Sequence, residues 1–470
     1  MFEIRFYNTL SRSKELFTPL HDMSVGMYQC GPTVYWTQHI GNLRAAVMGD
    51  LVVRSLRHLG YDITLVRNYT DVGHLTSDED AGEDKLEKGA RREGTTPEAI
   101  AQKYIAQYED DIAALNILPA TIKPRATEHI PEIIDMVQVL LQKGYAYQTD
   151  LAVYFDVSSA KEYTRLSHQH EDELRSGAGS GEVSDPQKKN PRDFALWFFK
   201  AGVHTHALQT WPSPFSSPLV QHGEGFPGWH IECSAMSKKY LGDVMDIHMG
   251  GIEHIPVHHT NEIAQSEGAN GVAPARIWLH NEHLLVDNAK MAKSQGTGYA
   301  LDEVRARGYD PLVLRYFFLQ AHYRSKQNFT WEALDAAARG LVNMYTKMRD
   351  LPTSEQVLPD NDCMARFDAA LADDCNVPQA LAIAHDTLNS PLSPEIKRAT
   401  LLSMDAVLGL CLGEQLPAEI PTDILARAKE RTVARLNGDY AAADVIRDEL
   451  RAKGYEIKDT VDGGRVVRIF

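Results

Sequence analysis

The chain has 470 residues, of which 43% are hydrophobic and 24% are charged. These proportions are typical of a globular protein and exclude a disordered or fibrous one. A chain of this length is too long for one hydrophobic core, so we expect two to four domains. The net charge of −16 excludes a broad basic surface for nonspecific nucleic-acid binding, but leaves room for a local basic stripe.

The sequence also indicates a compartment. It has no apolar run near the roughly 18 residues that a membrane span needs, and residues 1–20 lack the apolar core of a signal peptide. We therefore expect a cytoplasmic protein with no membrane partner. The cysteines are too few for a disulfide framework, so each is expected to be a core residue, a metal ligand or a nucleophile. They are Cys30, Cys233, Cys363, Cys375 and Cys411.

Residues 27–70 predict a strand, a loop, a helix and a second strand. The helix at 43–59 has apolar residues at helical spacing, with Asn42 as its expected N-cap and Gly60 as its stop. Such a unit forms a right-handed parallel crossover, and ligands bind at the carboxyl ends of its strands. Cys30 and the loop that follows it lie at that edge.

The remaining chain divides into segments of different composition. Residues 74–96 are charge-dense and predict a surface loop, 97–147 are expected to be largely helical, and 151–157 predict a strand. The Gly- and Ser-rich segment 168–192 predicts a mobile loop. Helices are predicted at 331–348, 364–389 and 394–411, followed by a helical hairpin at 423–454 and a β-hairpin around residues 462–464.

Two short motifs indicate nucleotide chemistry. HIGN, His39 to Asn42, precedes a helix, where backbone N–H groups and the helix dipole favour phosphate. Gly41 leaves room there for a base to pack against the backbone. KMAKS places Lys290 and Lys293 in a loop that could close over a triphosphate. The plainer interpretations are a surface histidine before a helix and a solvated basic loop.

A third set of residues has the donor types of a metal site. It comprises Cys30, Cys233, His258 and Glu262. The last two are four residues apart and share one face if their segment is helical. Two sulfurs, an imidazole and a carboxylate suit zinc. Because no CxxC pair is present, other residues remain possible ligands in place of these. They are His230, His248, His254 and His259.

Nine sequence blocks together resemble one enzyme family. In chain order they are MYQCGPTVY, HIGN, VRNYTDV, DFALWFFK, FPGWHIECSAM, DIHMGG, HHTNEIAQ, KMAKS and HYRSKQNFTW. From about residue 5 to about 460 the chain resembles the cysteinyl-tRNA synthetases, which are class I synthetases. The resemblance implies an α/β fold, with a Rossmann-type parallel-sheet catalytic domain over 1–330 and a connective insertion at roughly 115–225. It also implies an all-α bundle at 331–420 and an anticodon-recognition region with a small hairpin at 421–470.

The resemblance further implies an activity, a cysteine–tRNA ligase. Such an enzyme activates L-cysteine with ATP to cysteinyl-adenylate and pyrophosphate, and then transfers cysteine to the 3′-terminal ribose of tRNA(Cys). It implies one Zn²⁺ per chain, which selects the substrate thiolate over the hydroxyl of serine, and Mg²⁺ with ATP. We expect the protein to act as a monomer.

The family's site residues carry over position by position. By this resemblance the zinc ligands are Cys30, Cys233, His258 and Glu262, and the catalytic positions are His39, Asn42, Lys290 and Lys293. The positions that bind the amino acid and ATP are Gly31, Thr33, Gly41, Thr70, Trp229, Asp246, Gly250, Gly251 and Lys293.

The sequence departs from the family at several points, and alternatives stay open. Ala292 and Thr260 replace a usual serine and a usual glutamate, and residues 74–96 and the tail after 460 do not follow the family pattern. The basic residues of 423–458 alternate with acidic ones, which also fits a solvated helix pair. The alternatives are a cysteine ligase acting on a small-molecule amine, an inactive tRNA-binding regulatory relative, and a synthetase for another amino acid.

Overall fold

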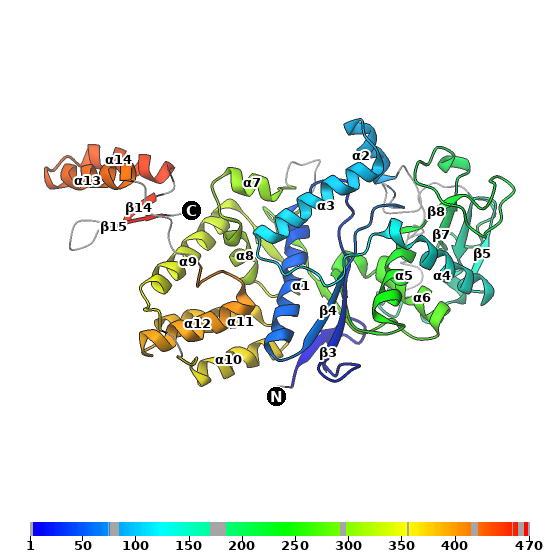
Figure 1. The fold of residues 1–470 in the computed structure, drawn as a ribbon, viewed down its shortest axis with the longest axis horizontal. Coiled ribbons are helices and arrows are strands. Elements are labelled where there is room, and N and C mark those ends of the chain that lie inside the picture. Colours follow the sequence, from blue (N-terminus) through cyan, green and yellow to red (C-terminus); the bar gives the residue numbers. More distant parts are fainter. Residues whose placement is uncertain are drawn as a thin grey trace.

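The computed structural model describes residues 3–73, 75, 84–169, 185–291, 298–354, 357–414, 422–453, 455–458 and 465–468. The molecule is elongated, with the C-terminal helices α13 and α14 at one end and strand β5 near the other (Figure 1). Across these ranges no helix is both long and apolar enough to cross a membrane.

A four-stranded parallel sheet forms the centre of the predicted domain over residues 1–330. Its strand order is β10–β9–β3–β4, with β3 at Ser24–Gln29, β4 at Asp62–Arg67, β9 at Met245–Gly251 and β10 at Ala275–Asn281. Every residue of β9 is buried, as expected of a parallel strand covered on both faces. The predicted parallel α/β sheet is therefore confirmed.

Helix α1, Ile40–His58, connects β3 and β4 and packs Leu43, Val47 and Leu51 into the core. It begins earlier than predicted, and its N-cap is His39 rather than Asn42. The backbone N–H of Asn42 donates to Nδ1 of His39 at 3.2 Å, because an imidazole nitrogen can accept as a serine or aspartate cap would.

Two helices come after β4 in the chain. The sequence predicted a loop at 74–96 and a largely helical region at 97–147. Helix α2, Lys85–Glu93, is capped by the Asp84 carboxylate and ends at Gly94 in the left-handed conformation, so the loop prediction for 74–96 is wrong over this part. Residues 74 and 76–83 lie outside the described residues. Helix α3, Pro97–Ala114, precedes an irregular segment, a 3-10 turn at Ala126–His129 and helix α4 at Ile130–Gln142.

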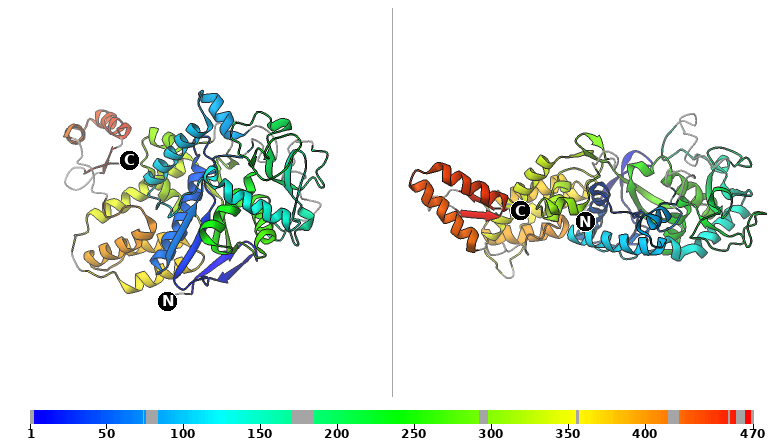
Figure 2. Two further views of the ribbon diagram at one scale, coloured as in Figure 1. Left: turned by 45° about the vertical axis from the view of Figure 1, so that its right-hand side comes forward. Right: turned by 90° about the horizontal axis from the view of Figure 1, so that it is seen from above.

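The inserted part is an antiparallel sheet with helices packed beside it. Its order is β5 (Ala146–Gln148), β6 (Ala152–Phe155), β7 (Phe194–Phe199) and β8 (Gly225–Pro227). Helices α5, Trp229–Leu241, and α6, His258–Asn270, lie between it and the central sheet and bring residues distant in sequence together (Figure 2). Short 3-10 turns lie at Val157–Ser159, Gly202–His204 and Ile252–His254. Residues 170–184 of the predicted 168–192 loop are outside the described residues.

The rest of the chain is mainly helical. Small sheets are formed by β1 (Arg5–Asn8) with β2 (Ser13–Leu16), and by β11 (Leu284–Val286) with β12 (Ala289–Lys290) and β13 (Gln327–Phe329). The helices are α7 (Leu301–Ala306), α8 (Pro311–Leu319), α9 (Trp331–Arg349), α10 (Asn361–Ala372), α11 (Val377–Asn389) and α12 (Pro394–Leu408). The helix predicted over 364–389 is in fact two, because Asp374 and Cys375 adopt positive φ between them.

The C-terminal part has a small core of its own. Helices α13, Thr422–Leu436, and α14, Tyr440–Ala452, form the predicted hairpin, and strands β14, Tyr455–Lys458, and β15, Arg465–Arg468, pair as predicted. Ile424, Ile446 and Leu450 are buried in that core. The predicted turn at 462–464 lies outside the described residues.

Candidate active site

A cavity of about 500 Å³ opens at the carboxyl edge of the parallel sheet. Its lining residues lie at or just after the ends of β3, β4 and β9 and at the starts of α1, α5 and α6. Most of the predicted site residues line it, namely Cys30, Gly31, Thr33, His39, Gly41, Asn42, Thr70, Trp229, Cys233, Gly250, Gly251, His258 and Lys290. The structure thus brings together positions that are up to about 260 residues apart.

Three predicted site residues are placed differently. Asp246 lies at the amino end of β9, where its buried carboxylate accepts the N–H groups of Leu20 at 2.6 Å and Gly26 at 2.7 Å. It therefore holds the N-terminal segment and lies away from the cavity. Glu262 is 1% exposed and lies behind the cavity wall. Lys293 and Ala292 are outside the described residues.

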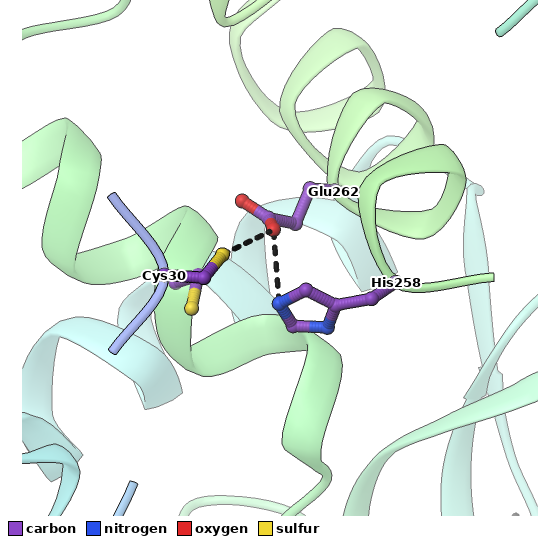
Figure 3. Close-up of side chains that lie close together, drawn as sticks. Cys30, His258 and Glu262 are labelled. Atoms are coloured by element: carbon purple, nitrogen blue, oxygen red, sulfur yellow. Dashed lines mark hydrogen bonds and ion pairs between the residues drawn. The ribbon is translucent and has the colours of Figure 1, made fainter. Parts of the chain in front are cut away.

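The four predicted metal ligands converge behind this wall. One donor atom from each of Cys30, Cys233, His258 and Glu262 lies within 4.8 Å of all the others. Nε2 of His258 is 3.0 Å from Oε1 of Glu262, and Sγ of Cys30 is 4.0 Å from the same oxygen (Figure 3). His258 and Glu262 share one face of α6, as their spacing predicted, while Cys233 comes from α5.

Histidines surround this cluster and form an overlapping second one. Cys30, His248, His259 and Glu262 also have their donor atoms within 4.8 Å of one another. Nε2 of His248 lies 2.9 Å from Oε2 of Glu262, and Nε2 of His259 lies 3.3 Å from Sγ of Cys30. His248 and His259 were among the alternative ligands of the sequence, and the geometry leaves both sets able to coordinate a metal.

The pKa values of the clustered side chains indicate which of them carry a proton in the absence of a metal ion. The pKa of the Cys233 thiol is about 6, because Cys30 donates a hydrogen bond to it and His258 lies beside it, against the effect of burial. Burial and Cys233 raise the pKa of the Cys30 thiol well above its usual value. Burial lowers the pKa of His258, but Glu262 and Cys233 outweigh it and raise it to about 10. Cys30 and His258 thus keep protons that a divalent cation can displace.

The start of α1 faces the same cavity and suits an anion. Its first N–H groups carry partial positive charge, as at any helix N-terminus. A Cβ on Gly41 would lie 2.2 Å from Cε of Met291 and 3.1 Å from the His39 ring, so a side chain there would fill the approach to the helix. Lys290, on β12, lines the same cavity.

The cavity also has an aromatic and polar wall between the helix start and the metal ligands. The Trp229 ring stacks on the His258 ring at 4.4 Å between centroids, and Thr33 pairs with Thr70 as an isolated bridge. Asn68, which the sequence analysis did not single out, accepts the N–H of Gly31 at 2.9 Å and lies 3.9 Å from Sγ of Cys233. The only sequence signal for Asn68 is its place after a predicted strand, in the block VRNYTDV.

The chain is similar in sequence to a known enzyme family and to several of its members. The family described as "tRNA synthetases class I (C) catalytic domain" matches residues 16–339. "Cysteine--tRNA ligase 1" of Burkholderia lata is 46% identical over 98% of this chain and 96% of the relative. The chain belongs to the cysteine–tRNA ligase family. "Cysteine--tRNA ligase" of Thermus thermophilus is 41% identical over 98% of both chains, and that of Treponema denticola is 40% identical over 97% of this chain and 98% of the relative.

A solved structure supports the fold of this family member. Mycobacterium tuberculosis methionyl-tRNA synthetase in complex with methionyl-adenylate superposes with a TM-score of 0.50, over 92% of this chain and 90% of that chain. The sequence identity is 15%, so this likeness concerns the fold alone. The class I synthetase fold predicted from the sequence is thereby confirmed.

Proposed function

We propose that the protein is an active cysteine–tRNA ligase, which activates L-cysteine with ATP and transfers it to the 3′-terminal ribose of tRNA(Cys). The observation that carries this proposal is the convergence of Cys30, Cys233, His258 and Glu262 beside a cavity whose other end is a helix N-terminus. A sulfur-rich metal cluster and an anion-binding helix end in one cavity suit a thiol amino acid and a nucleotide.

The donor set fits a zinc ion held by Cys30, Cys233, His258 and Glu262. Two thiols, one imidazole and one carboxylate are ligands that zinc prefers, and all four lie in reach of one point. When bound, zinc supplies a thiophilic centre that selects the cysteine thiolate over the serine hydroxyl, a pair that ordinary pockets separate poorly. The chain's contribution is to exclude water, since Cys233, His258 and Glu262 are each at most 1% exposed.

The other residues of the cavity position the reacting groups. The cysteine carboxylate attacks the α-phosphorus of ATP, and pyrophosphate leaves. The N-terminus of α1, with His39 and Asn42, would hold phosphate oxygens, while Lys290 and Lys293 would offset charge on the leaving pyrophosphate. Mg²⁺, when bound with ATP, would supply further positive charge there. Gly31, Thr33, Thr70 and Trp229 would surround the amino acid, and Gly250 and Gly251 would lie near the nucleotide. No protein nucleophile is required.

We further propose that three parts of the chain have different roles. Residues 1–330 would form the catalytic domain with its insertion, 331–420 a helical bundle, and 421–470 the region that recognises the anticodon. In the described part of that last region, Arg427 pairs with Glu430 and Glu449, and Arg447 pairs with Asp444 and Asp448. Exposed ion pairs of this kind are weak, so RNA phosphates can compete for these arginines. The protein would act as a cytoplasmic monomer.

Amino-acid-dependent exchange of labelled pyrophosphate into ATP tests the first step. We expect exchange with cysteine and a rate with serine that is lower by at least about a thousandfold, as a metal-selected thiolate allows. Equal rates for the two amino acids would contradict the proposal. Exchange with cysteine but no transfer to tRNA would favour a ligase for a small-molecule amine, and absence of exchange would favour an inactive tRNA-binding relative.

A further inference from the structure

An aromatic residue stands at the rim of the cavity and does not belong to the cluster of candidate metal ligands. Trp36 lies in the loop between β3 and α1 and is 36% exposed, which is unusual for a large ring beside a deep cavity. Tyr35 and Lys85 line the same side of the cavity. The rim is therefore formed jointly by this loop and by the start of α2.

The neighbours of Trp36 hold its ring in one orientation. The Arg92 guanidinium lies 3.8 Å from the centre of the Trp36 ring, and the Tyr104 ring of α3 is nearly parallel to it, at 6.4 Å and 21°. Arg92 is fixed in turn by Glu93 at 3.0 Å and by the Tyr104 hydroxyl at 3.3 Å. A ring held by such contacts loses little conformational entropy when a ligand stacks on it.

Positive charge extends from this ring along α2. Lys88, Arg91 and Arg92 are exposed on the helix and Lys85 is half-buried beside the Tyr35 ring, at 5.9 Å. Of the acidic side chains of α2, Glu87 is buried and accepts the N–H of Leu208, and Glu93 is paired with Lys103. Among the described residues, the side chains exposed on α2 are thus mainly basic, although the whole chain has a net charge of −16. Figure 1 shows α2 projecting at the top of the molecule above α3.

We infer that Trp36, held by Arg92 and Tyr104, is a stacking platform for the single-stranded 3′ end of the tRNA, and that the basic surface of α2 tracks its phosphates. Aromatic rings next to a positively charged surface are the general means of holding single-stranded nucleic acid. The platform adjoins the cavity in which the terminal ribose must meet the activated amino acid. The inference rests on the proposed function, since it names the residues that would guide the tRNA into that same site.

The test compares Trp36→Ala, Trp36→Phe and Arg92→Gln with the wild type. Arg276→Gln is the matched control, because Arg276 is an exposed arginine near the amino end of β10, at the opposite edge of the sheet. Cysteine-dependent pyrophosphate exchange and the charging kcat/KM for tRNA are measured for each variant. We expect Trp36→Ala to lower charging about 10- to 100-fold more than it lowers exchange. Trp36→Phe should recover most of this loss of charging, and Arg92→Gln should give a smaller loss. Arg276→Gln should lower neither charging nor exchange.

A binding measurement separates a tRNA contact from a change in the catalytic core. The Kd values are compared for intact tRNA and for the same tRNA trimmed of its single-stranded 3′ nucleotides. The wild type should bind the intact tRNA more tightly, and Trp36→Ala should bind both about equally. Equal losses of charging and exchange in Trp36→Ala, or an unchanged preference for intact tRNA, would overturn the inference. If the wild type itself exchanges pyrophosphate but never charges tRNA, the proposed function fails at its second step.

Discussion

Cys233, like His258, belongs to only one of the two overlapping ligand sets, so its replacement distinguishes between them. We expect Cys233→Ser to lose the bound metal, because a serine hydroxyl stays protonated and is a poor zinc ligand. The loss should be at least about tenfold in metal affinity, with a steep loss of cysteine activation. Metal content after dialysis, measured by mass spectrometry, checks this.

The matched control is Cys363→Ser. Cys363 is also buried, at 8% exposure, but it lies in α10, so this variant should keep its metal. A Cys233→Ser protein that retains one metal ion per chain would move the ion to the set that contains His248 and His259.

His204 is expected to make the stability of the folded protein depend on pH. Its ring packs against Phe198 and Phe226, at 4.8 and 5.1 Å, and burial lowers its pKa to about 4. Because this pKa is below the usual value near 6.5, the unfolded state binds the proton more tightly. The neutral ring therefore contributes its full stability above about pH 6.5, and this contribution is lost as the pH falls toward 4.

Acidification from pH 7 to 4.5 should thus cost about 2–3 kcal/mol through His204 alone. His204→Phe suits the aromatic surroundings and removes the titration, so its advantage over the wild type in thermal midpoint should grow as the pH falls. The measurement is thermal unfolding at several pH values. A difference between the two proteins that does not change with pH would contradict this assignment.

At the scale of elements, the first strand–helix–strand unit could be predicted because its apolar residues repeat at helical and strand spacing. Helix α2 could not, because KLEKGARRE is mostly charged and buries only a narrow face with Leu86, Gly89 and Ala90. The break between α10 and α11, where Asp374 and Cys375 take positive φ, was missed although Asn376 and Pro378 mark the start of α11. The site residues were found by resemblance, and Asn68 was missed because its role depends on contacts between segments.

Arg44 shows how α1 positions one wall of the site. Its side chain is fully buried and donates to the carbonyl oxygens of Glu282, His322 and Ser325 and to the Gln327 side chain. Arg44→Met leaves these acceptors unpaired and should lower the free energy of unfolding by about 3 kcal/mol. Because Glu282 lines the cavity, the KM for ATP should also rise.

Urea unfolding and pyrophosphate exchange check this prediction, with Arg57→Met as the control. Arg57 is on the same helix but exposed, so its replacement should change stability by less than about 0.5 kcal/mol. Similar effects of the two variants would show that the buried contacts of Arg44 do not contribute to stability.

At the scale of the whole molecule, a buried ion-pair cluster joins the catalytic part to the helices that follow it. The Asp50 carboxylate on α1 lies 2.7 Å from Arg315 of α8 and 2.8 Å from Arg54, and Asp50 and Arg315 have fully buried side chains. Arg315 also donates to the carbonyl oxygen of Leu408 at the end of α12. Asp50→Asn leaves buried positive charge unpaired and should cost about 3–5 kcal/mol.

An exposed pair that joins the same two parts provides the control. Lys14 and Asp373 are 2.6 Å apart, but their side chains are 41% and 57% exposed. Asp373→Asn should therefore cost less than about 1 kcal/mol. Calorimetric unfolding of both variants makes the comparison, and a loss for Asp50→Asn no larger than that for Asp373→Asn would show that the buried cluster does not couple the two parts.

The measurement that tests the central claim most directly is the charging of total tRNA with labelled cysteine by the purified full chain, with ATP and Mg²⁺, and with labelled serine as the control. The account predicts that cysteine is attached to tRNA and that serine is not, since the thiol-selective cluster lies in the same cavity as the anion-binding helix end. Charging with serine at a comparable rate, or no charging with cysteine, would contradict it.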